Sequence, residues 1–298
     1  MQLHTINTGF FKLDGGAMFG VVPKTIWNKS NPADASNLCT WALRCLLIET
    51  GNRLILVDTG IGDKQDAKFF GHYELHGGVD LGDSLKLKGF SKELITDVFL
   101  THLHFDHCGG AIIRQGDRLL PAFPNARYWS NDQHWTWATE PNEREKASFL
   151  KENILPIRES GRLEMVSVAD LSTDMAMTPS GQESGVQLPS TVFTEEFKIR
   201  FVHGHTRAMM LPQVVYKGRT IVFMADLLPS AGHLPIPYVM AYDMFPLTSL
   251  REKRSFLEEA LAGDYILFFE HDPMFECCTL QKTEKGIRAR EFFALKDL

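Results

Sequence analysis

The pattern of apolar and polar positions predicts a chain of short strands with few long helices. Two pairs of apolar runs, each pair joined by turn residues, predict β-hairpins. These pairs are 41–49 with 53–57, and 213–216 with 220–224. Largely apolar runs predict buried strands at 97–100 and 265–269. Further strands are predicted at 3–11, 17–22 and 192–202.

One long helix is predicted at 248–262, where apolar residues recur at helical spacing and Gly263 ends the pattern. Shorter helices are expected at 91–95, 132–138 and 142–153. Asn142 is the expected N-cap of the helix at 142–153. In the glycine-rich stretch 60–89 the pattern is too irregular to predict a helix or a strand. Because each half of the chain runs strands, helix, strand, we expect two packed sheets with helices outside.

Length and composition favour one large folded unit. The chain has 298 residues, of which 44% are hydrophobic, enough for a substantial core. We therefore predict a single domain over 1–298, made of two halves joined by an exposed connection near 173–190 that is rich in Ser, Gly, Pro and Gln.

Charge and cysteine content indicate which binding partners and which cellular location to expect for the protein. The formal net charge of −6 gives no basic field that would gather nucleic acid. No apolar run approaches the roughly 18 residues of a membrane span, and the first residues do not resemble a signal peptide. The five cysteines are an odd number without CxxC spacing, so we expect no disulfide framework and a cytoplasmic location.

The strongest chemical signal follows the apolar run that ends at Leu100. His102, His104, Asp106 and His107 stand within six residues, and burying them without partners would be costly. A divalent cation would supply that partner. Because alternate side chains of an extended segment share a face, His102 and His104 can bind one ion. A turn at Phe105 would direct Asp106 and His107 the other way, which implies two adjacent metal positions.

This HxHxDH pattern resembles the signature of the metallo-β-lactamase superfamily, and four further motifs stand in the family's order. They are Val57-Asp58-Thr59-Gly60, Gly204-His205-Thr206, Ala225-Asp226 and Glu270-His271-Asp272. The resemblance implies an α/β fold of the four-layer αββα sandwich type, in which two packed mixed β-sheets are flanked by helices.

The resemblance also implies a ligand for each metal position. The first metal would be held by His102, His104 and His205. The second would be held by Asp106, His107 and His271. Asp226 would bridge both, and Asp58 would orient a ligand histidine. Two divalent ions are expected, with zinc first and Mn, Fe or Co as alternatives.

The expected chemistry is hydrolysis by a hydroxide that bridges the two metals. Asp106 would take up the proton of the attacking hydroxide, so Asp106 and Asp226 are the predicted catalytic residues. The segment THLHFDHCGG is especially similar to that of N-acyl-homoserine lactonases, in a branch that includes methyl parathion hydrolase. The predicted substrate is a small lactone or carboxylic ester, with promiscuous phosphotriester activity.

Several side chains are candidates for substrate binding or have simpler explanations. The candidates are Phe19, Trp27, Phe105, Arg207 and His233. Phe19 and Trp27 could equally serve a subunit contact, so a homodimer stays open. His203 is expected to face away from the metals, Cys108 to be a small buried filler, and three other histidines to lie on the surface or in loops. These three are His72, His76 and His134.

Two other functions fit the same resemblance. Iron-dependent redox enzymes such as persulfide dioxygenases share the fold, but they hold one iron with fewer ligands than this chain offers. A phosphodiesterase or nuclease is the other alternative, and the acidic balance without a basic arm counts against it. No GxSxG motif suggests a serine nucleophile.

Overall fold

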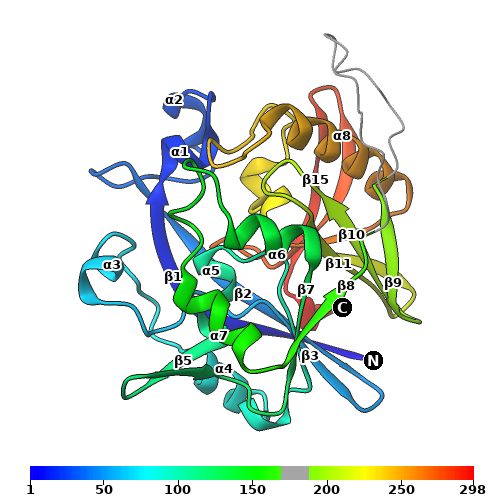
Figure 1. Ribbon diagram of the computed structural model, residues 1–298. Coiled ribbons are helices and arrows are strands. Elements are labelled where there is room, and N and C mark those ends of the chain that lie inside the picture. Colours follow the sequence, from blue (N-terminus) through cyan, green and yellow to red (C-terminus); the bar gives the residue numbers. More distant parts are fainter. Residues whose placement is uncertain (169–187) are drawn as a thin grey trace. The chain divides into compact units, whose positions relative to one another are not determined.

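The computed structural model describes residues 1–168 and 188–298 (Figure 1). These residues divide into two compact units. Unit 1 consists of Met1–Leu13 and Thr40–Val166, and unit 2 of Asp14–Cys39 and Ser167–Leu298. Most of the connection predicted near 173–190 lies outside the described residues. The single domain over 1–298 stays a prediction.

Unit 1 is built on a six-stranded mixed sheet in the order β1-β2-β3-β4-β7-β8. Its strands are β1 (Gln2–Asp14), β2 (Leu38–Thr50), β3 (Arg53–Val57), β4 (Asp97–Phe99), β7 (Arg127–Asn131) and β8 (Leu163–Val166). The β2–β3 hairpin is antiparallel, whereas β3, β4, β7 and β8 run parallel. The carboxyl ends of β3 and β4 therefore meet at one edge, where α/β proteins place their functional groups.

The remaining elements of unit 1 connect these strands. The helices are α3 (Ala67–Gly71), α4 (Leu81–Leu87), α5 (Phe105–Cys108), α6 (Asp132–Thr139) and α7 (Lys151–Glu159), with 3₁₀ turns η1 (Lys92–Leu94) and η2 (Gly109–Ala111). A small hairpin is formed by β5 (Ile112–Gln115) and β6 (Arg118–Pro121). Leu56 and Val98, partners on β3 and β4, belong to the buried core of this unit.

Unit 2 contains a seven-stranded mixed sheet in the order β15-β14-β13-β12-β11-β10-β9. Its strands are β9 (Ser190–Thr194), β10 (Phe197–Val202), β11 (Met209–Tyr216), β12 (Arg219–Phe223), β13 (Ile266–Phe268), β14 (Cys277–Thr283) and β15 (Gly286–Phe293). Its helical elements are α1 (Gly15–Phe19), α2 (Lys24–Trp27), η3 (Ala225–Leu227), η4 (Ala231–His233), α8 (Pro246–Ala262) and η5 (Leu295–Asp297). Because β12 and β13 are parallel, their carboxyl ends also share an edge.

The α/β class with mixed sheets is confirmed, as are both predicted hairpins and the helix that ends at Gly263. The strand predicted at 17–22 is wrong, because the Asp14 side chain accepts the Ala17 N–H at 2.8 Å and starts α1. The stretch 60–89 contains α3 and α4, each begun by an aspartate cap. The run predicted as one strand at 192–202 is the β9–β10 hairpin.

The helix predicted at 142–153 begins only at Lys151. Asn142 does cap a turn, because its side chain accepts the Arg144 and Glu145 N–H groups. The turn does not continue as a helix, since the Ser148 carbonyl accepts the Phe105 N–H at 3.0 Å instead of a helical one. At 91–95 the chain forms only a 3₁₀ turn.

The five cysteines are free and buried. The cytoplasmic location stays a prediction. Among the described residues, no helix combines the length and apolar character needed to cross a bilayer.

Candidate metal centre

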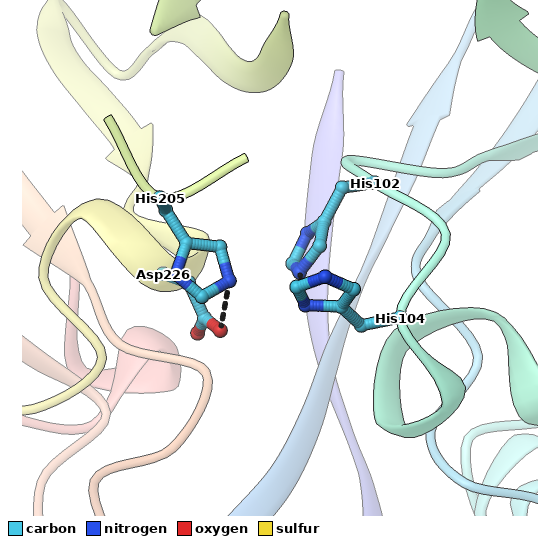
Figure 2. Close-up of side chains that lie close together, drawn as sticks. All are labelled: His102, His104, His205 and Asp226. Carbon is cyan, nitrogen blue, oxygen red and sulfur yellow. Dashed lines mark hydrogen bonds and ion pairs between the residues drawn. The ribbon is translucent and has the colours of Figure 1, made fainter. Parts of the chain in front are cut away.

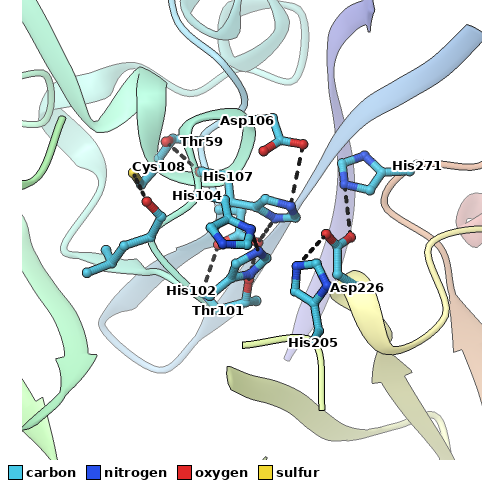
Figure 3. A network of polar contacts seen from close by, with 12 residues as sticks. Thr59, Thr101, His102, His104, Asp106, His107, Cys108, His205, Asp226 and His271 are labelled. Carbon is cyan, nitrogen blue, oxygen red and sulfur yellow. Dashed lines mark hydrogen bonds and ion pairs between the residues drawn. The ribbon is translucent and has the colours of Figure 1, made fainter. Parts of the chain in front are cut away.

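Four of the predicted ligands lie in unit 1, immediately after β4. His102, His104, Asp106 and His107 are all buried, with at most 8% of any residue exposed. Thr59, which follows β3, donates through both its N–H and its hydroxyl to the His107 carbonyl, at 2.8 and 2.9 Å. These bonds hold the ligand-bearing loop against the end of the neighbouring strand (Figure 3).

Asp58 lies at the end of β3 with both carboxylate oxygens engaged. Oδ1 accepts the Thr101 N–H at 2.8 Å, and Oδ2 accepts the Thr101 hydroxyl at 2.6 Å. Oδ2 also lies 3.1 Å from His107 Nδ1. Because a carboxylate only accepts hydrogen bonds, His107 carries its proton on Nδ1. The Nε2 lone pair is thereby directed toward Asp106, whose Oδ2 is 3.7 Å away.

The rings of His102 and His104 face each other through their nitrogens (Figure 2). His102 Nε2 lies 3.1 Å from His104 Nδ1. Since the Thr101 hydroxyl donates to Asp58, it accepts from His102 Nδ1, which lies 3.1 Å away. A neutral His102 therefore holds a lone pair on Nε2.

Glu145 fixes His104 in the same way, although nothing in its sequence context pointed to it. Its Oε1 lies 2.9 Å from His104 Nε2, and its Oε2 accepts the Trp137 indole N–H at 2.5 Å. The proton of a neutral His104 thus belongs on Nε2, which leaves a lone pair on Nδ1. Two lone pairs 3.1 Å apart cannot bond each other, so the neutral pair suits a cation bound by both nitrogens.

The surface or loop position predicted for His134 is wrong. The ring is fully buried in α6, and its Nε2 accepts the N–H of Leu103, the residue between His102 and His104, at 2.9 Å. His134 therefore supports the backbone of the ligand loop. His72 and His76, in contrast, are exposed as expected.

The other three predicted ligands lie in unit 2, each just beyond a strand of the seven-stranded sheet. His205 follows β10, Asp226 follows β12, and His271 follows β13. The two oxygens of Asp226 face different imidazoles, with Oδ2 3.1 Å from His205 Nε2 and Oδ1 3.2 Å from His271 Nε2 (Figure 3). One carboxylate thus serves two histidines.

Asp243 orients His205, and sequence reasoning did not assign it this role. Its Oδ1 lies 2.8 Å from His205 Nδ1, which directs Nε2 to Asp226. Burial lowers the pKa of His205, but the Asp226 and Asp243 carboxylates outweigh it and raise the pKa to about 10. The site therefore favours positive charge at His205 Nε2. His203 is placed differently, since its Nδ1 accepts the Ala208 N–H at 3.2 Å.

The donor atoms fit a divalent metal ion. Around a tetrahedral zinc with bonds of about 2.0–2.2 Å, neighbouring ligand atoms lie roughly 3.3 Å apart. The ligand atoms of His102 and His104 are 3.1 Å apart, and those of Asp226 lie 3.1 and 3.2 Å from its histidines. Imidazole and carboxylate donors suit Zn, Mn, Fe or Co. Cys108 does not suit a metal ligand, because its thiol donates a hydrogen bond to the Leu103 carbonyl and burial raises the pKa of the thiol to about 12.

Two of the candidate substrate-binding residues lie next to ligands. Phe105 packs against Phe69 and Tyr73, with ring centroids 5.4 and 4.7 Å away, and forms an aromatic cluster beside the ligand loop of unit 1. Arg207, two residues after His205, is partly exposed.

The other three candidates form one buried stack in unit 2. Phe19 lies between Trp27 and His233, with ring centroids 5.3 and 4.5 Å away, and none of the three is more than 1% exposed. His233 Nε2 donates to the Met18 carbonyl at 2.9 Å, and Nδ1 accepts the Ser230 hydroxyl at 2.8 Å. Phe19, Trp27 and His233 thus pack against one another inside unit 2, and a role in substrate binding stays a prediction for all three.

Acidification is expected to destabilise the protein through His233. Burial lowers the pKa of His233 from 6.5 to about 3, so the unfolded chain binds a proton that the folded chain excludes between these values. The contribution of the neutral His233 to the free energy of unfolding is fully present above pH 6.5. It is lost as the pH falls toward 3, by about 1.4 kcal/mol per pH unit. Urea unfolding of the wild type and of His233→Gln from pH 7 to 4 measures this. The free energy of unfolding of His233→Gln should fall less steeply with decreasing pH than that of the wild type, by up to about 1.4 kcal/mol per pH unit. The same pH dependence in both proteins would contradict the prediction.

Comparisons with known proteins find one family model and several similar solved structures. Residues 44–115 match the family model of the metallo-beta-lactamase superfamily. A probable metal-dependent hydrolase from Staphylococcus aureus is 25% identical, with a TM-score of 0.84 over 100% of this chain and 98% of that chain. AidC, a dizinc quorum-quenching lactonase, is 20% identical, with a TM-score of 0.75 over 98% of this chain and 95% of that chain.

A third solved structure, an N-acyl homoserine lactone hydrolase with a product bound at its metal centre, is 19% identical, with a TM-score of 0.65 over 91% of this chain and 93% of that chain. A search of curated proteins finds no match. The segment 44–115, which includes the ligand loop of unit 1, thus has the sequence of a metallo-β-lactamase superfamily domain. The solved structures share the fold of this chain over 91–100% of its length.

Proposed function

We propose that the protein is a dinuclear metal-dependent hydrolase that opens a lactone or cleaves another carboxylic ester. The observation that carries the proposal is Asp226, whose two oxygens each face the Nε2 of a different buried histidine. A carboxylate placed in this way suits a bridge between two cations. In a hydrogen-bonding role, His205 would have to carry a second proton on Nε2, because its Nδ1 already faces Asp243.

In this proposal the ligands from the two units act together. His102, His104 and His205 would hold one ion. Asp106, His107 and His271 would hold the other, and Asp226 would contact both. Zinc is the first choice of metal. Two such ions would lower the pKa of water and polarise the scissile carbonyl.

The chain's own carboxylates would do the rest. Asp58, Glu145 and Asp243 keep the ligand imidazoles in the tautomers that present a lone pair. Asp106 would accept the proton released during attack at one of its carboxylate oxygens. Both predicted catalytic carboxylates, Asp106 and Asp226, are 8% exposed.

The lactone or ester class is supported by two features. The structurally similar proteins include lactonases, and the aromatic cluster of Phe69, Tyr73 and Phe105 lies beside the ligand loop of unit 1. Pockets for small substrates are mostly apolar with few polar anchors. An acyl lactone or aryl ester has the apolar part that such a cluster would contact.

The test is a substrate panel of N-acyl lactones, aryl esters and a phosphotriester, assayed on protein reconstituted with Zn²⁺, Mn²⁺ or Co²⁺. We expect about two bound ions per chain and the highest kcat/KM for a lactone or ester. His104→Ala should lower kcat/KM by more than about 100-fold, because losing a ligand exceeds the usual cost of losing its outer partner. His72→Ala, an exposed histidine, is the control. Turnover retained in His104→Ala with verified metal content, or stoichiometric iron with oxygen uptake, would refute the proposal.

A further inference from the structure

Helix α8 carries two adjacent charged residues in its buried face. Glu252 is 6% exposed and Lys253 is 1% exposed. Glutamate and lysine are almost never buried to this extent without partners. Successive residues of a helix point about 100° apart, so the two side chains reach different segments. Both segments lead to His205.

Glu252 holds the backbone just before His205. Its Oε1 accepts the His203 N–H at 2.7 Å, and its Oε2 accepts the Gly204 N–H at 3.0 Å. Strand β10 ends at Val202, so these two amides have no neighbouring strand among the described residues to accept their hydrogen bonds. The Glu252 carboxylate of α8 supplies the acceptors instead. One carboxylate with both oxygens engaged fixes two successive peptide planes.

Helix α8 packs so closely against the backbone at Gly204 that no side chain fits between them. A Cβ on Gly204 would lie 2.2 Å from Ser249 Oγ and 2.3 Å from the Ser249 nitrogen. Only glycine fits there, and Ser249 lies three residues before Glu252 on the same helix. The backbone of His205 is therefore placed directly by α8.

Lys253 holds the segment that orients the His205 ring. Its Nζ donates to the carbonyls of Pro235 and Tyr238, at 2.8 and 2.9 Å. The chain then runs to Asp243, whose carboxylate faces His205 Nδ1, and the next N–H, that of Met244, donates to the His205 carbonyl at 3.0 Å. Ammonium and neutral amine alike can donate both bonds, so this role does not require the charge.

We propose that Glu252 and Lys253 are positioning residues for the His205 imidazole, Glu252 through the backbone and Lys253 through the segment that carries Asp243. Neither side chain would touch a substrate. The consequence for metal binding rests on the proposed function, in which His205 is a ligand, whereas the positioning of the ring itself does not.

The test compares Glu252→Gln and Lys253→Met with Glu258→Gln, an exposed glutamate on the same helix. The glutamine keeps the size of Glu252 but turns an NH₂ group toward one of the two N–H donors. Glu252→Gln should speed amide exchange at His203 and Gly204, whereas Lys253→Met should leave those amides protected. Both should shift the His205 imidazole ¹⁵N signals of the metal-free protein. Each should also weaken Co²⁺ binding by about 10- to 100-fold, as is usual for partners of metal ligands.

The measurements are made at pH 8.5, because burial raises the pKa of Glu252 to about 8. A lower melting temperature with unchanged His205 signals and unchanged Co²⁺ affinity would overturn the positioning role. If the wild type bound no Co²⁺, the proposed function would fail, and the amide exchange and ¹⁵N signals would still decide the positioning role. Should Glu252→Gln not fold, Glu252→Asp, which keeps the carboxylate but shortens its reach, replaces it with the same expectations.

Discussion

Replacement of Asp226 by asparagine is expected to weaken both metal ions together and to lower kcat/KM by more than about 100-fold. The wild-type carboxylate offers one oxygen to His205 Nε2 at 3.1 Å and the other to His271 Nε2 at 3.2 Å. Asparagine has the same shape but only one oxygen, and its NH₂ group cannot bind a metal. Whichever way the amide turns, one of the two cations loses its bridging ligand, and both cations lose the negative charge that the carboxylate shares between them.

Metal content after dialysis, together with calorimetric titration of Zn²⁺, measures the effect of Asp226→Asn. Asp117→Asn, in an exposed turn of unit 1, is the matched control and should keep two ions and full activity. Loss of one ion with the other bound at wild-type affinity would argue against the bridging role. The fold should survive, because Asp226 lies beyond the end of β12 and not within the apolar core.

The sequence was sufficient to predict those parts of the site whose residues stand close together along the chain. His102, His104, Asp106 and His107 stand together after an apolar strand, and parallel neighbours β3 and β4 then bring Asp58 to the same edge. Periodicity and turn residues were sufficient for the hairpins because both are local properties.

The partners of the ligands could not be predicted, since only tertiary folding brings them close. Glu145 is 41 residues from His104, and Asp243 is 38 residues from His205. Each is a single carboxylate in an ordinary polar stretch. A buried carboxylate facing a histidine becomes visible only once the distances are known.

The aromatic stack of unit 2 shows a second limit of sequence patterns. Phe19 and Trp27 were interpreted as residues of a site mouth or a subunit contact, yet both are buried. A Cβ on Gly15 would lie 2.3 Å from the Trp27 ring, so the missing side chain at Gly15 is what lets the tryptophan pack inward. Such a close approach between ring and backbone has no periodic signature.

A close approach of the same kind underlies the second large effect that we expect. Gly109 has an ordinary helical φ of −59°, so an alanine would be tolerated by its own backbone. A Cβ there would nevertheless lie 2.0 Å from the Ile61 carbonyl oxygen and 2.5 Å from the carbonyl carbon. The Lys64 ammonium also donates to the Gly109 carbonyl, which ties the two segments together from the other side.

Gly109→Ala is therefore expected to lower the free energy of unfolding by about 3 kcal/mol, at the upper end of overpacking effects. The strain should also displace the turn that carries Asp106 and His107, so that one metal ion is bound more weakly than the other. Urea unfolding and metal titration measure the two effects. Gly71→Ala is the control, because nothing lies within 4 Å of its Cβ. A Gly109→Ala protein as stable as the wild type, with both ions bound, would show that the two segments separate at little cost.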